Sequence, residues 1–237
     1  MRVVVTRPQP DGDRTAGALR EHGHEVILAP LMRVETVDAD LSGEFSAVII
    51  TSANALRASA GREQFATLTR LPLFAVGARS AAVAREHGFG TVISAHGDAK
   101  SLVRLIAARC ATASAPLLYL AGEDRAADLE GELAQKGIPA KTAVVYRAVT
   151  VAFPPVLGEA LRAGNVDAIL HFSARSAENY LRGAQNAGLL TEALAPRHLC
   201  LSAQVASSLA AAGPAKVEIA AAPNEAALLA LVEQAQA

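Results

Sequence analysis

The chain has 237 residues, of which 51% are hydrophobic and 19% are charged, and its formal net charge is -1. This composition excludes an intrinsically disordered chain, which would need low hydrophobicity and a high net charge. The near balance of 22 basic and 23 acidic residues argues against a nucleic-acid-binding protein, and the length allows one large domain or two small ones.

The chain shows no sign of secretion or of membrane insertion. Its two cysteines, Cys110 and Cys200, are too few for a disulfide scaffold and fit a reduced compartment. The first apolar stretch, Val3–Val5, ends at Thr6-Arg7-Pro8 and is too short for a secretory signal. No stretch approaches the roughly 20 apolar residues of a membrane span. We therefore expect a cytoplasmic protein without membrane or nucleic-acid partners.

Short apolar runs alternate with helical segments along the whole chain. The first strand is predicted over Val3–Val5, followed by a helix over Arg14–His22 and a second strand before Val34. The further strands are predicted at Ala47–Ile50, Leu73–Val76, Leu117–Leu120, Ala168–Phe172 and Leu199–Leu201. The further helices are predicted at Ala55–Ala60, Ser80–His87, Arg125–Lys136, Ala177–Ala187 and Gln204–Ala212. Uninterrupted apolar runs are typical of parallel strands buried on both faces, so we predict an α/β fold with helices on both faces of its sheets.

The predicted elements occur twice in the same order. Residues 3–34 align with a segment 114 positions later, residues 45–58 with a segment 121 positions later, and residues 73–88 with residues 198–213. Five helices are expected to end at a glycine in the left-handed conformation, namely Gly23, Gly88, Gly137, Gly188 and Gly213. The sequence therefore predicts a duplicated α/β unit with about four or five strands in each half.

Small, hydroxylated or basic residues follow the predicted strands. In open α/β sheets, ligands bind beyond the carboxyl ends of the strands. The candidate binding residues at these ends are Arg7, Thr51, Ser52, Asn54, Gly77, Ala78, Gly122, Ser173, Ser176 and Ser202. Each lies next to a predicted helix, whose N-terminus favours anions. This pattern indicates an anion-binding cleft, but simple helix capping by the Ser, Thr and Asn side chains is an open alternative, as is an ion pair for Arg7.

Motifs that would specify a reaction are missing. The chain has no glycine-rich dinucleotide or phosphate loop and no nucleophile elbow. The six histidines show no metal-binding spacing, and His171 is expected to be a core or sheet-rim residue. Cys200, inside an apolar strand, is expected to be a buried structural thiol. The residues alone thus predict a fold class and an anion-binding cleft, but no reaction.

Several segments together resemble the uroporphyrinogen-III synthase family over nearly the whole chain. They are VVVTRP at 3–8, APL at 29–31, VIITSANA at 48–55, FAVGARSA at 74–81, LYLAGEDR at 118–125, VVYRAV at 144–149, HFSARSAENYL at 171–181 and LCLSAQVASSL at 199–209. The chain departs from many relatives at Arg175 and Ser176, where a proline is common in the turn, and at Ser202, where threonine is frequent.

The resemblance implies a particular domain organisation. Two doubly wound parallel-sheet domains would be joined by a two-stranded β linker, with one domain inserted in the other. On this chain, residues 1–33 and 151–237 would form a discontinuous domain, residues 38–145 the second domain, and residues 34–37 and 146–150 the linker. The residues alone favour a different, continuous split near Ser114-Ala115-Pro116.

The resemblance also implies an activity. Members of this family are cofactor-independent lyases that close linear hydroxymethylbilane to uroporphyrinogen III, with loss of water and inversion of ring D through a spiro intermediate. Tyr146 matches the family tyrosine of the returning linker strand and is expected to protonate the departing hydroxyl. The many carboxylates of the substrate would explain the anion-binding residues at the strand ends. Hydroxymethylbilane synthase would hand over the substrate, and the enzyme is expected to be a monomer.

Other interpretations stay open at this point. Arg147 should point away from Tyr146, and both a linker ion pair and a substrate carboxylate are possible partners. A non-catalytic two-lobed protein that binds small anions would also explain the duplication and the cleft. A nucleotide-sugar transferase is disfavoured, because the chain has neither a D-x-D motif nor a phosphate loop.

Overall fold

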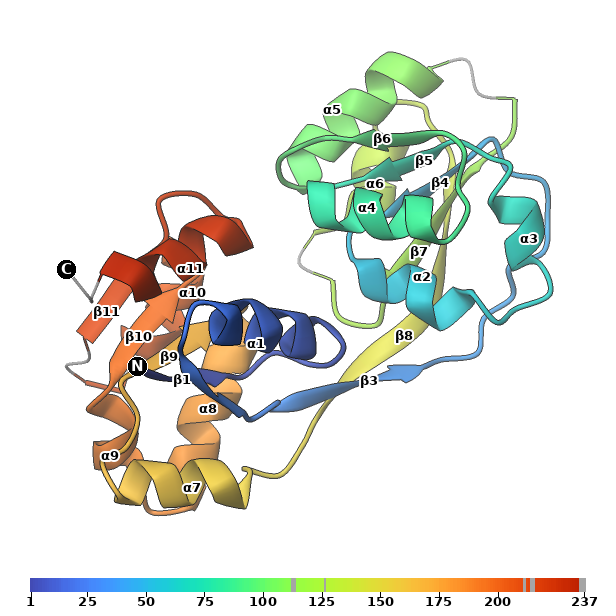
Figure 1. Ribbon diagram of the computed structural model, residues 1–237. Coiled ribbons are helices and arrows are strands. Elements are labelled where there is room, and N and C mark those ends of the chain that lie inside the picture. The colour runs from blue at the N-terminus through green and yellow to red at the C-terminus, as the bar shows by residue number, and fades with distance from the viewer. Residues whose placement is uncertain (112–113, 126, 211, 214–215, 235–237) are drawn as a thin grey trace. The chain divides into compact units, whose positions relative to one another are not determined.

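The computed structural model describes residues 1–111, 114–125, 127–210, 212–213 and 216–234. The chain divides into two compact units: unit 1 comprises Met1–Arg33 and Val149–Ala237, and unit 2 comprises Val34–Ala148. The chain passes from one unit to the other within the strands β3 (Met32–Thr36) and β8 (Ala140–Thr150), both labelled in Figure 1.

Unit 1 contains a parallel sheet with the strand order β11-β10-β9-β1-β2. The strands are β1 (Arg2–Val5), β2 (Glu25–Leu28), β9 (Ala168–His171), β10 (Arg197–Cys200) and β11 (Lys216–Ile219). The helices are α1 (Asp11–Glu21), α7 (Pro155–Arg162), α8 (Ala174–Asn186), α9 (Leu190–Leu194), α10 (Ala203–Ala210) and α11 (Glu225–Glu233). Val4 packs in a cluster with residues of α7 and α8, whereas Val3 and Val5 pack with residues of α1 and α11. Alternate residues of β1 therefore serve two cores, one on each face of the sheet.

Unit 2 contains a sheet with the strand order β3-β8-β7-β4-β5-β6. The remaining strands are β4 (Ala47–Ile50), β5 (Leu73–Ala75), β6 (Val92–Ser94) and β7 (Leu117–Gly122). The helices are α2 (Ala53–Ser59), α3 (Phe65–Leu68), α4 (Ala78–Glu86), α5 (Ala99–Cys110) and α6 (Leu129–Ala134). Val48 and Ile50 pack in one core cluster and Ala47 and Ile49 in another, so this sheet is also covered on both faces.

The strands from β4 to β8 are parallel, whereas β3 runs antiparallel to β8. The amide of Val37 donates to the carbonyl of Val145, and the amide of Val151 donates to the carbonyl of Leu31, at 2.8 and 3.1 Å. As the residue number rises from 31 to 37 on the β3 side, the number of the paired residue on the β8 side falls from 151 to 145. This is the pattern of an antiparallel pair.

All seven predicted strands and five of the six predicted helices lie close to their expected positions, and all five predicted glycine ends have a positive φ. The prediction of a helix from Arg125 was wrong at its start, because Asp128 accepts a hydrogen bond from the amide of Gly131 and α6 begins only at Leu129. The strands β6 and β11 were not predicted, since they are short and mostly half-buried or exposed.

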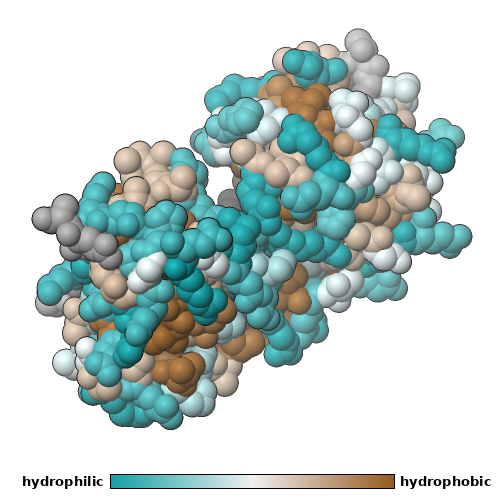
Figure 2. All heavy atoms as spheres, viewed as in Figure 1, coloured by the Kyte–Doolittle hydropathy of each residue, from teal (hydrophilic) through white to brown (hydrophobic). Residues whose placement is uncertain are grey.

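No helix in the described part of the chain is long and apolar enough to cross a membrane. Figure 2 shows mostly hydrophilic residues on the visible face of each unit, with apolar residues gathered in a few small areas. Val156, Val217 and Ile219 are the large apolar side chains most exposed in the described residues.

Candidate functional site

A pocket of about 200 Å³ lies in unit 2 at the carboxyl ends of β4, β5 and β7. This is the edge at which open parallel sheets place their ligands. The residues that line it include Thr51, Val76, Tyr119, Gly122, Asp124, Arg125 and Tyr146. The pocket thus contains two phenols (Tyr119 and Tyr146), the Thr51 hydroxyl, and the oppositely charged Asp124 and Arg125, together with Gly122.

Tyr146 reaches this pocket from β8. It pairs with Gly122 of β7, next to a register shift between Ala121 and Gly122, and its carbonyl accepts from the amide of Glu123 at 2.9 Å. A Cβ atom added to Gly122 would lie 2.7 Å from Cζ of Tyr146 and 2.8 Å from its hydroxyl oxygen. The ring therefore occupies space that only a glycine leaves open at this position.

The surroundings of Tyr146 keep its phenol protonated. Burial raises the pKa of the Tyr146 phenol, a side-chain hydrogen bond with Ser52 lowers it, and the nearby Tyr119 and Asp124 raise it further. The net direction is upward from the ordinary value of 10.0. At neutral pH the group is therefore a neutral phenol, which can donate a proton within the pocket.

Tyr119 is a member of the pocket that sequence reasoning missed. Its side chain is only 3% exposed, and its hydroxyl lies 3.1 Å from Oγ1 of Thr51, within hydrogen-bond distance. A tyrosine within the otherwise aliphatic run Leu117–Leu120 was the available signal, because a buried phenol normally finds a polar partner. Asp124 and Arg125 were also missed, and Arg125 was read as the first residue of a helix.

Three predicted serines have the local role of helix caps. The hydroxyl of Ser52 accepts from the amide of Asn54 at 3.2 Å, and the hydroxyl of Ser173 accepts from the amide of Ser176 at 3.1 Å. The hydroxyl of Ser202 likewise accepts from the amide of Val205, at 3.4 Å. Capping thus accounts for the choice of serine at these positions, and substrate binding by the same residues stays a prediction.

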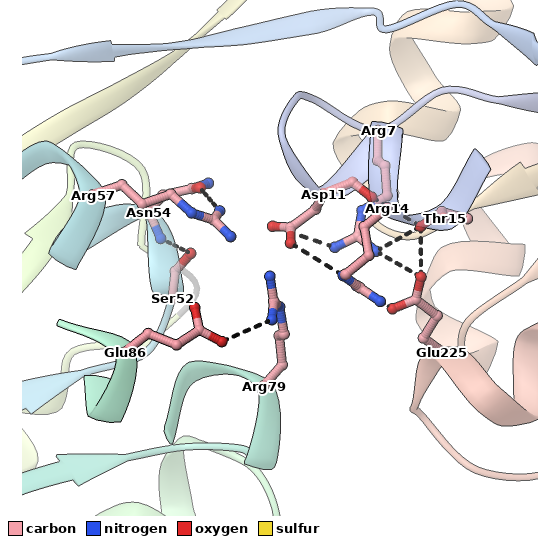
Figure 3. Close-up of polar contacts among 10 residues, drawn as sticks. All are labelled: Arg7, Asp11, Arg14, Thr15, Ser52, Asn54, Arg57, Arg79, Glu86 and Glu225. Carbon is pink, nitrogen blue, oxygen red and sulfur yellow. Dashed lines mark hydrogen bonds and ion pairs between the residues drawn. The ribbon is translucent and has the colours of Figure 1, made fainter. Parts of the chain in front are cut away.

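The other candidates of unit 2 lie at the starts of α2 and α4. Oδ1 of Asn54 accepts from Nη1 of Arg57 at 2.9 Å, as Figure 3 shows. Gly77 is the N-cap of α4 and Ala78 is its first residue, so this helix start has no capping side chain. Only backbone groups can contact a ligand there through these two residues.

Arg7 is held by partners within unit 1. Its guanidinium lies 3.7 Å from the carboxylate of Asp11, 3.5 Å from that of Glu225 and 4.2 Å from the centre of the Phe172 ring. Figure 3 shows Arg7 beside Asp11 and Glu225. The ion-pair interpretation of Arg7 is therefore realised, and its side chain is only 17% exposed.

Arg147 also forms an ion pair. Its Nε and Nη2 atoms donate to one carboxylate oxygen of Glu35 at 3.0 and 2.9 Å, across the β3–β8 pair. The ion-pair interpretation of Arg147, which the sequence left open, is realised here.

The candidate residues fall on both units. Thr51, Gly122 and Tyr146 line the pocket of unit 2, and Ser52 contacts Tyr146. Four other candidates lie in unit 1: Arg7, Ser173, Ser176 and Ser202. In the part of the chain that the structure describes, no group of three or more His, Cys, Asp or Glu side chains could hold a metal ion.

His171 and Cys200 are buried core residues, as predicted. His171 is fully buried, and its ring stacks on that of His198, with Nε2 and Nδ1 3.0 Å apart. Burial lowers the pKa of both histidines and raises the pKa of the Cys200 thiol to about 12. These groups are therefore neutral at physiological pH.

Comparisons with known proteins give a consistent result. The family model described as uroporphyrinogen-III synthase HemD matches residues 13–230. A uroporphyrinogen-III synthetase from Helicobacter pylori is 19% identical with a TM-score of 0.67, and the match covers 99% of this chain and 100% of that chain. A mutant uroporphyrinogen III synthase from Thermus thermophilus is 20% identical with a TM-score of 0.56, and the match covers 100% of this chain and 98% of that chain. No curated protein sequence matches the chain significantly. At these identities the structural likeness establishes an α/β fold with parallel sheets and helices.

Proposed function

The chain belongs to the uroporphyrinogen-III synthase HemD family, and we propose that it closes hydroxymethylbilane to uroporphyrinogen III, with loss of water and inversion of ring D. The observation that carries this proposal is the pocket of unit 2, in which a neutral phenol projects from β8 beside two hydroxylated side chains. The reaction needs one group that helps a hydroxyl leave, and Tyr146 has the protonation state for that role.

Tyr146 donates its proton to the hydroxyl of hydroxymethylbilane as the C–O bond breaks, and water leaves. Ring D attacks the azafulvene cation through the carbon that already carries the bridge to ring C, which gives the spiro-pyrrolenine. The bond between that carbon and the ring C bridge then breaks, and the bridge bonds to the free α-carbon of ring D, so that ring D is inverted. Loss of a proton from the pyrrole restores a neutral product and balances the proton given by the phenol. General acid catalysis of this kind typically contributes about 10²- to 10⁴-fold to a rate.

Positioning is the larger task in this reaction. The unassisted substrate closes without inversion, so the protein must hold the chain in the geometry that leads to the spiro intermediate. The near-neutral protein does this through local groups. The carboxylates would be bound by Arg7, by the hydroxyls of Thr51, Ser52, Ser173, Ser176 and Ser202, by Asn54, and by backbone N–H groups at Gly77, Ala78 and Gly122.

The domain organisation proposed for the family fits the chain path. Residues 34–37 and 146–150 would form the linker between a discontinuous domain of residues 1–33 and 151–237 and an inserted domain of residues 38–145. The antiparallel pairing of β3 with β8 and the Glu35–Arg147 ion pair support this assignment. We further propose a monomeric cytoplasmic enzyme that uses neither cofactor nor metal and receives its substrate from hydroxymethylbilane synthase. The two free cysteines fit the reduced compartment of this proposal.

The role of Tyr146 is tested by Tyr146→Phe. This change removes only the hydroxyl, and we expect the rate of uroporphyrinogen III formation to fall by about 10²-fold or more while the melting temperature stays close to that of the wild type. Tyr180→Phe is the matched control, because the Tyr180 hydroxyl donates to the carbonyl of Ala193 inside unit 1. The control should keep its turnover. An unchanged rate in Tyr146→Phe would remove the phenol from the mechanism.

A further inference from the structure

A second pocket, of about 310 Å³, lies entirely within unit 1 between α8 and the segment 150–153. Leu31, Val151 and Phe153 give it an apolar wall, and Asn179, Arg182 and Asn186 of α8 give it a polar one. The volume is at the lower end of the range for small-molecule sites, which suits a ligand with a single ring. The site described above, in unit 2, shares none of these residues.

The polar wall contains a buried donor without a partner. Asn179 is 5% exposed and lines the pocket, and its Oδ1 accepts from the hydroxyl of Thr150 at 3.4 Å. Its Nδ2 has no hydrogen-bond partner among the described residues. An unpaired buried polar group destabilises the free protein, so a ligand acceptor that reaches Nδ2 would lower the free energy of the complex.

Arg182 supplies a positive charge three residues after Asn179 on the same face of α8. Arg182 is exposed, lines the pocket and forms no ion pair with any residue that the structure describes. The lining residues include no carboxylate that would compete with an anionic ligand. An amide donor and a guanidinium on one wall are the groups that bind a carboxylate.

The Phe153 ring of the apolar wall is fixed by close packing. A Cβ atom on Gly183 would overlap Cδ2 of Phe153 and lie 3.1 Å from Cγ, so the phenyl ring sits directly against the helix backbone. The same ring packs at 6.2 Å between centroids against the buried Tyr180. A flat ring can therefore lie against a rigid apolar surface while its carboxylate reaches the polar wall.

We propose that this pocket of unit 1 binds a small carboxylate that carries one apolar ring, with Arg182 and Asn179 as the groups that recognise the carboxylate. Two sources share this chemistry: a free organic acid, and one carboxylate-bearing ring of the tetrapyrrole substrate. The proposal of a site does not depend on the synthase reaction.

Benzoate is a suitable probe, followed by amide chemical shifts in two-dimensional NMR of the full chain. We expect saturable shifts at Val151, Phe153 and Gly183 at millimolar benzoate, and at least tenfold weaker binding of benzamide, which has the same shape but no charge. Arg182→Met should weaken benzoate binding at least fivefold, whereas Arg20→Met on α1 should not change it. Absence of saturable shifts, equal binding of benzamide, or unchanged binding by Arg182→Met would each overturn the proposal.

Asn179→Leu is a second test, which does not change the charge of the protein as Arg182→Met does. Replacing a buried amide whose Nδ2 is unpaired and whose Oδ1 has one long hydrogen bond should leave the melting temperature close to that of the wild type, while benzoate binding falls at least fivefold. Unchanged benzoate binding in a folded Asn179→Leu protein would overturn the role of the amide. The two sources are separated by steady-state kinetics: a raised KM for hydroxymethylbilane in Arg182→Met assigns the pocket to a substrate ring, and an unchanged KM with lost benzoate binding assigns it to a free acid.

Discussion

Gly122→Ala is the substitution that most directly probes how the pocket holds Tyr146. The added Cβ would lie 2.7 Å from Cζ and 2.8 Å from the hydroxyl oxygen of Tyr146. Ordinary van der Waals contact begins at 3.4 Å, so the end of the phenol ring must move by about 0.7 Å or more. The backbone of Gly122 does not have a positive φ, so alanine brings no backbone strain of its own.

A displacement of this size is large for catalysis and small for folding. Misplacement of a reacting group by about 1 Å can cost on the order of 100-fold in rate, so we expect Gly122→Ala to lower turnover by about 10- to 100-fold. The melting temperature should fall only modestly, because the ring end is half-buried and can shift.

The assay is the rate at which freshly generated hydroxymethylbilane is converted to the type III isomer, read by chromatography after oxidation. Gly17→Ala in α1 is the matched control, since a Cβ there meets no atom within 4 Å. Its turnover should equal that of the wild type. A wild-type rate in Gly122→Ala would refute the conclusion that the contact between Gly122 and Tyr146 sets the position of the acid.

Two further predictions concern titration. The chain has three tyrosines and no tryptophan, so phenolate absorbance should show a step for Tyr146 above pH 10.0 that is missing in Tyr146→Phe; a midpoint at or below 10.0 would contradict the effect of burial. Burial lowers the pKa of His171 to about 3 and that of His198 to about 4, while the unfolded chain takes up these protons near pH 6.5. The stability that the two neutral histidines contribute is therefore present above about pH 6.5 and is lost as the pH falls towards 4, by about 2 kcal/mol for each histidine between pH 7 and pH 5. Urea unfolding measures the free energy of unfolding at pH 7 and at pH 5. The difference between the two values should be smaller in the double variant His171→Leu/His198→Leu than in the wild type. An equal difference would exclude the two histidines as the cause of the pH dependence.

The central strands could be predicted from the sequence because they are buried on both faces. Ala47–Ile50 was predicted with the same bounds as β4, since every residue of this strand is buried and apolar. At the sheet edges this signal disappears. In β11 three of four residues are exposed, so no continuous apolar run marks the strand.

The site was predictable to different degrees for different residues. Thr51 and Gly122 follow from their position at strand ends, and both line the pocket of unit 2. Tyr146 was singled out only by the family resemblance, because a tyrosine in a strand has no distinctive local pattern. For Tyr119 the signal was a single tyrosine in the apolar run Leu117–Leu120. That signal was weak, because its polar partner Thr51 is 68 residues away in the chain and a tyrosine in an apolar strand resembles ordinary core packing.

The isomer composition of the product tests the proposed function most directly. Purified wild-type chain is added to freshly generated hydroxymethylbilane, beside a sample without protein, and the oxidised porphyrins are separated by chromatography. We predict mainly the type III isomer in the presence of the protein and the type I isomer in its absence. Type I isomer alone in both samples would contradict the assignment of this chain as an enzyme that inverts ring D.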